Sequence, residues 1–222
     1  MPKSTFFRLP EERRERLVSE AIVEFSDRSY TEASLSQIAR RASIPKGSVY
    51  QYFEDKLDLY RWLLTEEAPR RKREFVGAAS QDGDFWARLE TFIERGMAFL
   101  VEHPRLARLS AAAAAPTAVV EVRGLYKAIC EAGLAELRAV LEAGAKSGAL
   151  KAPDLDVATR FVSTLIGPGL TDVILQELGA ELHEVLASDN LRKRLNLKRR
   201  RALAHQTVLF IRDGLGAEGK RK

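Results

Sequence analysis

The sequence contains very few of the residues from which disulfides and metal sites are made. Among its 222 residues there is one cysteine, Cys130, and there are three histidines, which lack the spacing of metal ligands. No glycine-rich phosphate loop is present. We therefore expect no disulfide, no metal, no cofactor and no enzymatic activity. A helical enzyme stays open as the less favoured alternative, because this argument rests on patterns that are missing.

Long apolar stretches are missing as well. No run approaches the roughly 20 residues that a membrane-spanning helix needs, and the start, MPKSTFFRLPEERRE, lacks the apolar region of a signal peptide. We therefore expect a cytoplasmic protein. Hydrophobic residues make up 45% and charged residues 30% of the chain, as in a globular protein. The net charge of +5 mildly favours an acidic partner, either nucleic acid or an anionic membrane.

Residues 34–53, SLSQIARRASIPKGSVYQYF, predict two short helices joined by a tight turn. Ser34 and Gln37 have the spacing of a capping box, which begins a helix, and apolar residues follow at helical intervals. Pro45 ends this helix, because proline disfavours helical geometry in the residue before it. Proline also fits the first turn of a second helix, which can therefore begin at once.

The second of these helices has a composition that is unusual for a core helix. Val49 and Phe53 are four residues apart and face inward together, so lysine, hydroxyl, amide and phenol groups point outward. Such a face can contact phosphates and base edges, which makes the pair a helix-turn-helix. An ordinary surface pair of helices with scattered tyrosines is the alternative that the composition leaves open.

A longer helix precedes this stretch and is predicted to lie across it. It begins at Pro10, and its buried stripe consists of Leu17, Val18, Ala21, Ile22 and Phe25. Residues 1–9 are expected to form a loose arm, whose basic residues either reach a DNA backbone or have no role.

A series of residues at fixed spacing extends over this region. It consists of Phe25, Tyr30, Thr31, Ser34, Ile38, Ala39, Ile44, Pro45, Lys46, Gly47, Ser48, Val49, Tyr50, Tyr52, Phe53, Lys56 and Leu59. The series resembles the N-terminal domain of the TetR/AcrR family of bacterial transcriptional regulators, over about residues 10–64. Two residues depart from the family's pattern. Ser29 stands where a glycine is usual after the first helix, and Pro45 stands where a serine usually caps the recognition helix.

The resemblance implies an all-α protein with two domains. A three-helix helix-turn-helix domain covers residues 1–64, and a linking helix runs on to about residue 80. A larger C-terminal helical domain for effector binding and dimerisation covers residues 81–222. We interpret the protein as a homodimeric DNA-binding transcriptional regulator. Most specifically, we expect a repressor that a small-molecule effector releases from a palindromic double-stranded DNA operator.

The resemblance also aligns a set of residues with positions that contact DNA in the family. They are Ser34, Ser36, Lys46, Gly47, Ser48, Tyr50, Gln51, Tyr52 and Lys56. We assign Gln51 and Ser48 to base edges, since an amide can pair bidentately with adenine. The lysines and tyrosines are assigned to phosphates.

The C-terminal half shows no strand pattern and reads as helices that contain several glycines. These are Gly96, Gly124, Gly133, Gly144, Gly167 and Gly169. Each costs about 1 kcal/mol relative to alanine, so their number suggests either close helix contacts or room for a ligand.

Several helices of this half carry aromatic residues that are candidates for an effector pocket, with one histidine as a polar anchor. The candidates are Trp86, Phe92, Phe99, His103, Tyr126 and Phe161. A pocket of this kind suits an apolar or amphipathic small molecule with one or two polar contacts. The alternative is that each of these residues belongs to an ordinary core.

Two long helices, over about residues 154–178 and 188–214, are implied by the resemblance to pair with their copies in the dimer. The candidate interface residues are Phe161, Leu165, Leu203, Leu209 and Phe210.

A basic cluster lies in the last part of the chain and consists of Arg192, Lys193, Arg194, Lys198, Arg199, Arg200 and Arg201. It would suit an anionic membrane or non-specific nucleic acid, which is the alternative to a regulator. We favour a solvated helix face, because apolar residues run beside the cluster, and we expect no membrane partner.

Overall fold

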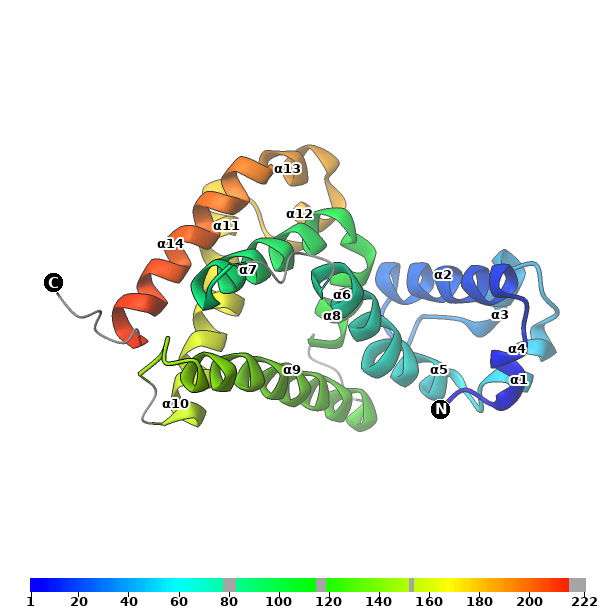
Figure 1. The fold of residues 1–222 in the computed structure, drawn as a ribbon. Coiled ribbons are helices and arrows are strands. Elements are labelled where there is room, and N and C mark those ends of the chain that lie inside the picture. Colours follow the sequence, from blue (N-terminus) through cyan, green and yellow to red (C-terminus); the bar gives the residue numbers. More distant parts are fainter. Residues whose placement is uncertain (78–82, 115–118, 152–153, 216–222) are drawn as a thin grey trace, which may run out of the picture. The chain divides into compact units, whose positions relative to one another are not determined.

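The computed structural model describes residues 1–77, 83–114, 119–151 and 154–215, and the structural statements below concern these residues. They form helices joined by short connections, with no strand among them, as the sequence predicted (Figure 1). The chain divides into two compact units. The first contains Met1–Lys72 and His103–Ile129, and the second contains Arg73–Glu102 and Cys130–Lys222. The domain boundary predicted near residue 81 falls among residues 78–82, which lie outside the described residues.

The first unit begins with a series of short helices. They are α1 (Ser4–Phe7), α2 (Glu11–Asp27), α3 (Leu35–Arg41), α4 (Lys46–Tyr52) and α5 (Lys56–Trp62). A π-helical turn, η1 (Leu63–Glu67), continues α5 into α6 (Ala68–Gly77). The unit is completed by α8 (Pro104–Ala114) and by the first part of α9 (Val120–Lys146).

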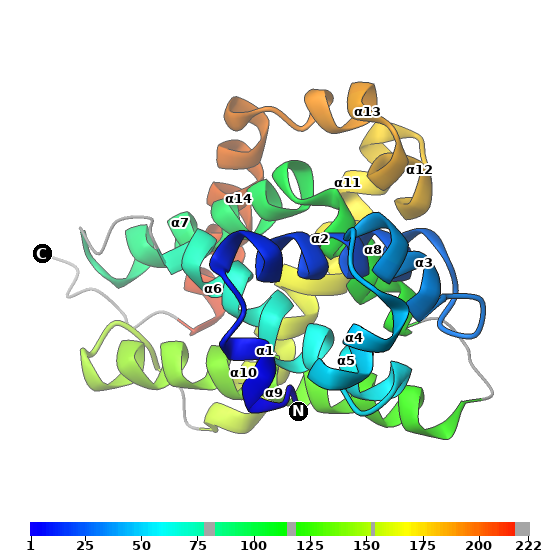
Figure 2. The ribbon, with the colours of Figure 1, turned by 90° about the vertical axis from the view of Figure 1, so that its right-hand side faces the viewer.

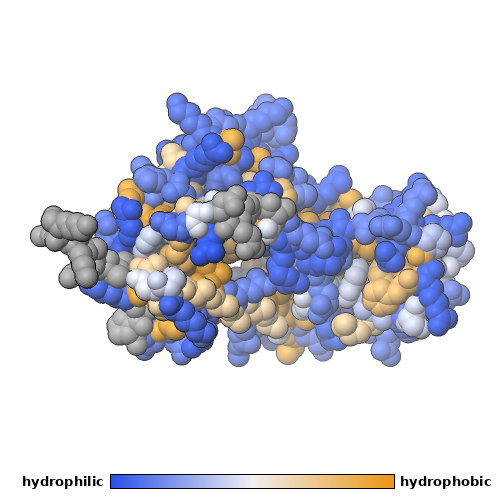
Figure 3. All heavy atoms as spheres, viewed as in Figure 1, coloured by the Kyte–Doolittle hydropathy of each residue, from blue (hydrophilic) through white to orange (hydrophobic). Residues whose placement is uncertain are grey.

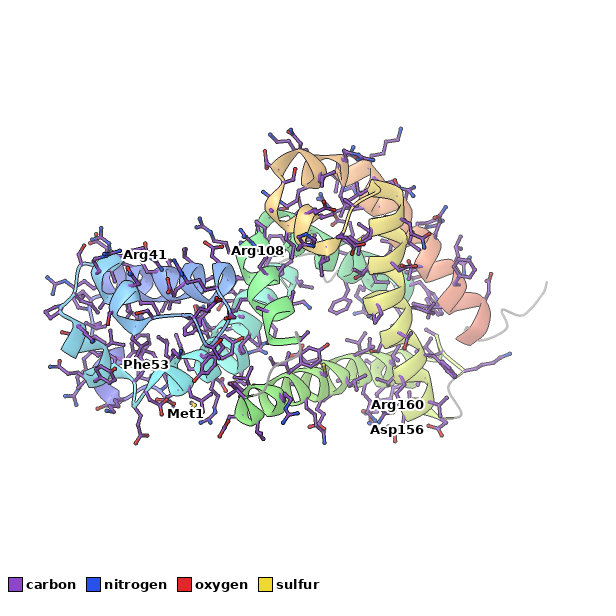
Figure 4. All side chains as sticks on the ribbon, turned by 180° about the vertical axis from the view of Figure 1, so that it is seen from behind. Met1, Arg41, Phe53, Arg108, Asp156 and Arg160 are labelled. Atoms are coloured by element: carbon purple, nitrogen blue, oxygen red, sulfur yellow. The ribbon has the colours of Figure 1, made fainter. Side chains whose placement is uncertain are left out.

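The core of the first unit lies between α2 and the helix-turn-helix. The stripe predicted on α2 is confirmed, and it is buried together with apolar residues of α3, α4 and α5: Leu17, Val18, Ala21, Ile22, Phe25, Ile38, Ala39, Val49, Phe53 and Leu59. Burying one large apolar side chain contributes about 1.5–3 kcal/mol, so this core fixes how α3 and α4 lie on α2. On the same helix, Asp27 pairs with Arg108 of α8, with Nη1 3.1 Å from Oδ1 (Figure 4).

The N-terminal residues are ordered, so the prediction of a loose arm was wrong. Residues Ser4–Phe7 form α1, and Phe6 is only 1% exposed. The centroid of its ring lies 5.1 Å from those of Phe53 and Trp62. One aromatic side chain that enters the core therefore attaches this segment to the first unit.

The second unit contains the remaining helices. They are α7 (Phe85–Glu102), the rest of α9, α10 (Leu155–Thr164), the π-helical turn η2 (Leu165–Gly169), α11 (Leu170–Leu178), α12 (Leu182–Ala187), α13 (Asp189–Arg194) and α14 (Leu197–Leu215). Its core includes Phe85, Leu89, Ile93, Leu141, Val162, Ile174, Leu203 and Val208. The helices α7 and α14 pack together, and the buried Glu94 and Arg200 pair between them at 2.7 Å.

One helix prediction in this unit was wrong. The last helix, predicted as continuous over residues 188–214, is broken between α13 and α14. At the break, the side chain of Asn196 accepts the N–H of Arg199 at 3.1 Å. This bond caps the start of α14, because a side-chain oxygen at that position satisfies a helix N–H that has no carbonyl partner.

The glycines of α7 and α9 differ in what surrounds them. A Cβ atom on Gly144 would lie 2.6 Å from the ring of Phe85 and 2.8 Å from Leu150, so this glycine permits a close contact. A Cβ atom on Gly96, Gly124 or Gly133 would meet no atom within 4 Å. Of these four positions, only Gly144 therefore needs a glycine for packing.

Candidate nucleic-acid interface

The turn between α3 and α4 depends on an unusual backbone conformation at Ser43. Its φ angle is +57°, in the left-handed region that non-glycine residues rarely adopt. This lets the N–H of Ser43 donate to the carbonyl of Arg40 and the N–H of Ile44 donate to that of Ala39. The pair of bonds is a Schellman motif, which ends α3 sharply and allows α4 to begin at Lys46.

Both ends of α3 are held by one carboxylate of α2. Glu24 is 1% exposed; its Oε1 accepts the backbone N–H of Ser34 at 2.9 Å and its Oε2 accepts Nη2 of Arg41 at 2.7 Å (Figure 4). Burial opposes the charge of Arg41, but its hydrogen bonds to Glu24 and Glu20 outweigh this and raise its pKa. The capping box predicted at Ser34 does not form, because its side chain accepts no cap hydrogen bond.

The outer face of α4 carries the residues that were predicted to contact DNA. Lys46, Gly47, Tyr50 and Gln51 are exposed, and Ser48 and Tyr52 are partly exposed, whereas Val49 and Phe53 are buried as predicted. Ser34 and Ser36 are partly exposed at the start of α3. The fold thus brings these side chains to one surface element, and their contact with DNA stays a prediction.

Lys56, predicted to hold a phosphate, is engaged inside the chain. Its Nζ donates to the carbonyls of Tyr30, Ala33 and Thr31 at 2.7, 3.0 and 3.2 Å, and it lies 4.6 Å from the centroid of the Tyr30 ring. A lysine ammonium has three N–H groups, so this arrangement uses all of them. In this conformation Lys56 fixes the connection between α2 and α3.

The candidate pocket residues are divided between the two units. His103 and Tyr126 belong to the first unit, and the other four belong to the second. Phe99 is buried and contacts Phe75, with their ring centroids 5.7 Å apart, whereas Tyr126 and Phe161 are 41% and 69% exposed. Trp86 and Phe92 pack, partly buried, against the core of the second unit.

Two surface hollows are formed by described residues, and none of these candidates lines them. One lies on α2 and α3 beside Glu24 and Arg41, and the other lies beside the end of α11, with Gly179 and Glu184 among its lining residues. Hydrophobic residues also follow the exposed face of α9 (Figure 3).

The candidate dimer residues divide into exposed and buried ones. Phe161, Leu165 and Phe210 are 69%, 42% and 75% exposed, which is unusual for large apolar side chains. Leu209 is partly buried. Leu203 is instead buried in the core of its own chain. Val157 and Val173 are further exposed apolar residues, on α10 and α11.

Much of the basic cluster is bonded within the chain. Arg192 donates to the carbonyl of Leu186 at 2.7 Å, at the end of α12, and Arg194 donates to that of Leu178 at 3.0 Å, at the end of α11. Arg200 pairs with Glu94, and Arg199 pairs with Glu177. Arginines placed at helix C-termini satisfy carbonyls that lack a helical partner, so the cluster has a structural use.

Two organising residues were missed by the sequence analysis. Glu24 lies three residues after Ala21 and thus on the buried stripe of α2, where a carboxylate is a sign of a buried partner. Phe6 lies in the segment that was predicted to be a loose arm, and the adjacent pair Phe6 and Phe7 was the available signal.

The described parts of the chain contain neither a cluster of metal ligands nor a membrane-spanning helix. There, no group of three or more His, Cys, Asp or Glu side chains could hold a metal ion. None of the described helices is long and apolar enough to cross a membrane.

The short α3, the Schellman turn and the exposed polar face of α4, all held on α2, define a helix-turn-helix protein. Comparison with known proteins agrees with this class. Residues 17–62 match the family model described as bacterial regulatory proteins, tetR family. The HTH-type transcriptional regulator HbdR from Aromatoleum sp. (strain CIB) is 44% identical over 52 residues, which is 23% of each protein. The chain thus spans about a quarter of the length of the curated relatives that it matches.

Solved structures extend the likeness to the whole fold. A TetR family transcriptional regulator from Chloroflexus aurantiacus J-10-FL superposes with a TM-score of 0.66 at 26% identity, over 98% of this chain and 100% of that one. FadR from Bacillus subtilis, in complex with stearoyl-CoA, has a TM-score of 0.62 at 18% identity, over 89% and 96% of the two chains. Residues 17–62 thus match the tetR family model, and the fold of the whole chain is similar to that of a TetR family transcriptional regulator.

Proposed function

We propose that this protein is a sequence-specific DNA-binding transcriptional regulator, and more specifically a repressor. The observation that carries the proposal is the exposed face of α4, with Lys46, Ser48, Tyr50 and Gln51 on a helix that α2 and α3 hold rigidly. In this proposal Gln51 and Ser48 contact base edges, while Lys46 and the tyrosines contact phosphates. Because the ammonium of Lys56 donates to three carbonyls of its own chain, this residue supports the DNA-reading surface in our proposal and does not contact a phosphate.

The protein acts as a homodimer in this proposal. One recognition helix reads only a few base pairs, so a two-fold dimer on a palindromic site, with half-sites about one helical turn apart, is the usual solution. The exposed Phe161, Leu165 and Phe210 supply an apolar surface that a second copy could cover. Phe161→Glu together with Phe210→Glu should therefore convert the dimer to a monomer, as measured by light scattering at micromolar concentration.

A small apolar or amphipathic effector is proposed to release the DNA. FadR from Bacillus subtilis, which has a similar fold, was solved in complex with stearoyl-CoA, and a Cβ atom on Gly96 of this chain would meet no atom within 4 Å. An effector weakens DNA binding tenfold if it binds the free form about 1.4 kcal/mol more tightly than the DNA-bound form. Gly96→Phe should fill this space and make DNA release insensitive to an effector found by thermal-shift screening.

The deciding experiment is a gel shift with a DNA fragment from near the protein's own coding region. The wild-type protein should retard this fragment at concentrations at which a scrambled fragment of equal length stays free. Lys46→Ala should weaken binding to all sequences, whereas Gln51→Ala should relax the preference at one base position by about 1–3 kcal/mol. Equal retardation of both fragments would contradict a sequence-specific regulator. It would revive the alternative of non-specific nucleic-acid binding.

A further inference from the structure

The short helix α1 lies against the C-terminal end of α4, as two views of the fold show (Figures 1 and 2). A helix leaves its last carbonyls without helical partners. In α4 three consecutive carbonyls, those of Tyr50, Gln51 and Tyr52, are in this position. All three accept hydrogen bonds from one segment at the N-terminus of the chain, residues 3–5.

Two residues of that segment provide the donors. Lys3 donates twice, from Nζ to the carbonyl of Tyr50 at 2.9 Å and from its backbone N–H to that of Tyr52 at 2.8 Å. The hydroxyl of Thr5 donates to the carbonyl of Gln51. The ammonium of Lys3 also opposes the negative end of the α4 dipole, which stabilises the contact further.

Phe6 anchors the segment from the other side. It is 1% exposed, and its ring contacts those of Phe53 at the end of α4 and Trp62 in α5. The neighbouring Phe7 is 58% exposed, and its ring contacts that of Phe6 edge-on, with 5.3 Å between the centroids. The segment is thus attached both to the backbone of α4 and to the helix that follows it.

We infer that residues 3–6 are a positioning clamp for the recognition helix. They fix the backbone of Tyr50, Gln51 and Tyr52, whose side chains form the end of the proposed DNA-reading face. A base contact depends on the direction of the side chain, so the clamp sets the sequence preference without contacting DNA itself. This inference rests on the proposed function, because residues 3–6 affect DNA binding only by positioning α4.

The test compares variants of the full-length chain that carry a tag only at the C-terminus. Thr5→Val removes the hydroxyl donor and keeps the shape of the side chain, and Thr5→Ser restores the donor. Ser4→Ala removes an exposed hydroxyl of the same helix and is the matched control. Each variant is used to select from a randomised duplex pool, and its affinity for the wild-type selected sequence is measured at several salt concentrations.

We expect Thr5→Val to bind the selected sequence about tenfold more weakly, which is the loss of about one base contact. Its base preference should broaden, its affinity for the unselected pool and its salt dependence should stay unchanged, and the amides of residues 51–53 should exchange faster. Thr5→Ser and Ser4→Ala should behave like the wild type. Thermal unfolding followed by circular dichroism checks that every variant is folded.

Three outcomes would overturn the clamp. The first is a Thr5→Val variant that keeps the base preference and the amide exchange rates of the wild type. This result would overturn the clamp and leave the proposed function intact. A uniform loss of affinity in Lys3→Met, with a salt dependence flatter by about one unit of slope, would make Lys3 a phosphate contact instead. A wild-type protein that enriches no sequence would overturn both the clamp and the proposed function.

Discussion

The buried carboxylate of Glu24 in α2 accepts Nη2 of Arg41 at the end of α3, with 2.7 Å between the oxygen and the nitrogen. Its other oxygen accepts the N–H of Ser34 at the start of α3. A single side chain thus sets the position of the helix that precedes the proposed recognition helix.

Glu24→Gln should lower the free energy of unfolding by roughly 2–4 kcal/mol, because it leaves Arg41 without its buried counter-charge. The effect is measured by urea denaturation near neutral pH. Arg28→Ala is the control, since Arg28 is 56% exposed and its Nε lies 3.6 Å from Glu24. That change should cost less than about 1 kcal/mol. Similar losses of unfolding free energy in both variants would argue that the pair of Glu24 and Arg41 contributes no more than a surface ion pair.

Ser43→Gly should stabilise the protein by about 1 kcal/mol, because glycine adopts a positive φ without the steric strain of a Cβ atom. The matched position is Gly179, whose φ is +63°. After α11 the N–H of Gly179 donates to the carbonyl of Gln176 and the N–H of Ala180 to that of Leu175, which is the same pair of bonds. Gly179→Ser should therefore destabilise the protein by a similar amount. Thermal and urea unfolding of both variants measure the two effects, and a destabilised Ser43→Gly would contradict the argument.

Gly144→Ala should destabilise the protein by about 1–3 kcal/mol, because the added methyl group overlaps the ring of Phe85 in a packed core. Gly133→Ala, on the same helix, should instead stabilise it by up to about 1 kcal/mol through helix propensity. Opposite signs in urea denaturation are the expected result. Equal effects would mean that the ring of Phe85 moves aside at little cost.

Lys56→Ala should lower the free energy of unfolding by about 1–3 kcal/mol, because three carbonyls lose a charged donor. It should leave the salt dependence of DNA binding unchanged. Lys46→Ala should do the reverse, with stability unchanged and a salt dependence flatter by about one unit of slope. Gel shifts at several salt concentrations separate the two. A flatter slope in Lys56→Ala would restore the phosphate contact first assigned to this residue.

The phenol of Tyr60 should make the protein sensitive to alkaline pH. Burial, with a contribution from nearby Tyr30, raises the pKa of Tyr60 to about 12. The folded state therefore retains this proton when the unfolded chain, with a pKa near 10, has released it. The stabilisation is complete below about pH 10 and is lost as the pH rises towards about 12.

Tyr60→Phe removes this titration while keeping the ring. Between about pH 8 and pH 11, wild type should lose roughly 1.4 kcal/mol more unfolding free energy than the variant. Urea denaturation at the two pH values measures the difference. An equal loss in both proteins would show that other groups cause the alkaline sensitivity.

Much of the helix-turn-helix was set by signals that act over a few residues. The apolar stripe of α2, the inward pair Val49 and Phe53, and the helix start after Pro45 all follow from helical periodicity and backbone restriction. Such signals depend only on neighbours along the chain, so the register of α3 and α4 and the outward face of α4 could be predicted. Even the break at Asn196 had a local signal, a capping residue, that was overlooked.

Tertiary structure decided which polar groups are free to meet a partner. Nothing near Lys56 in the sequence shows that its ammonium would reach the carbonyls of Tyr30 and Ala33, and nothing near Phe6 shows that it would enter the core beside Trp62. Likewise, Leu203 and Phe210 both belong to α14, yet one is buried and the other is 75% exposed. A charge or an apolar side chain takes the nearest partner in space that lowers its free energy, and folding alone brings that partner near.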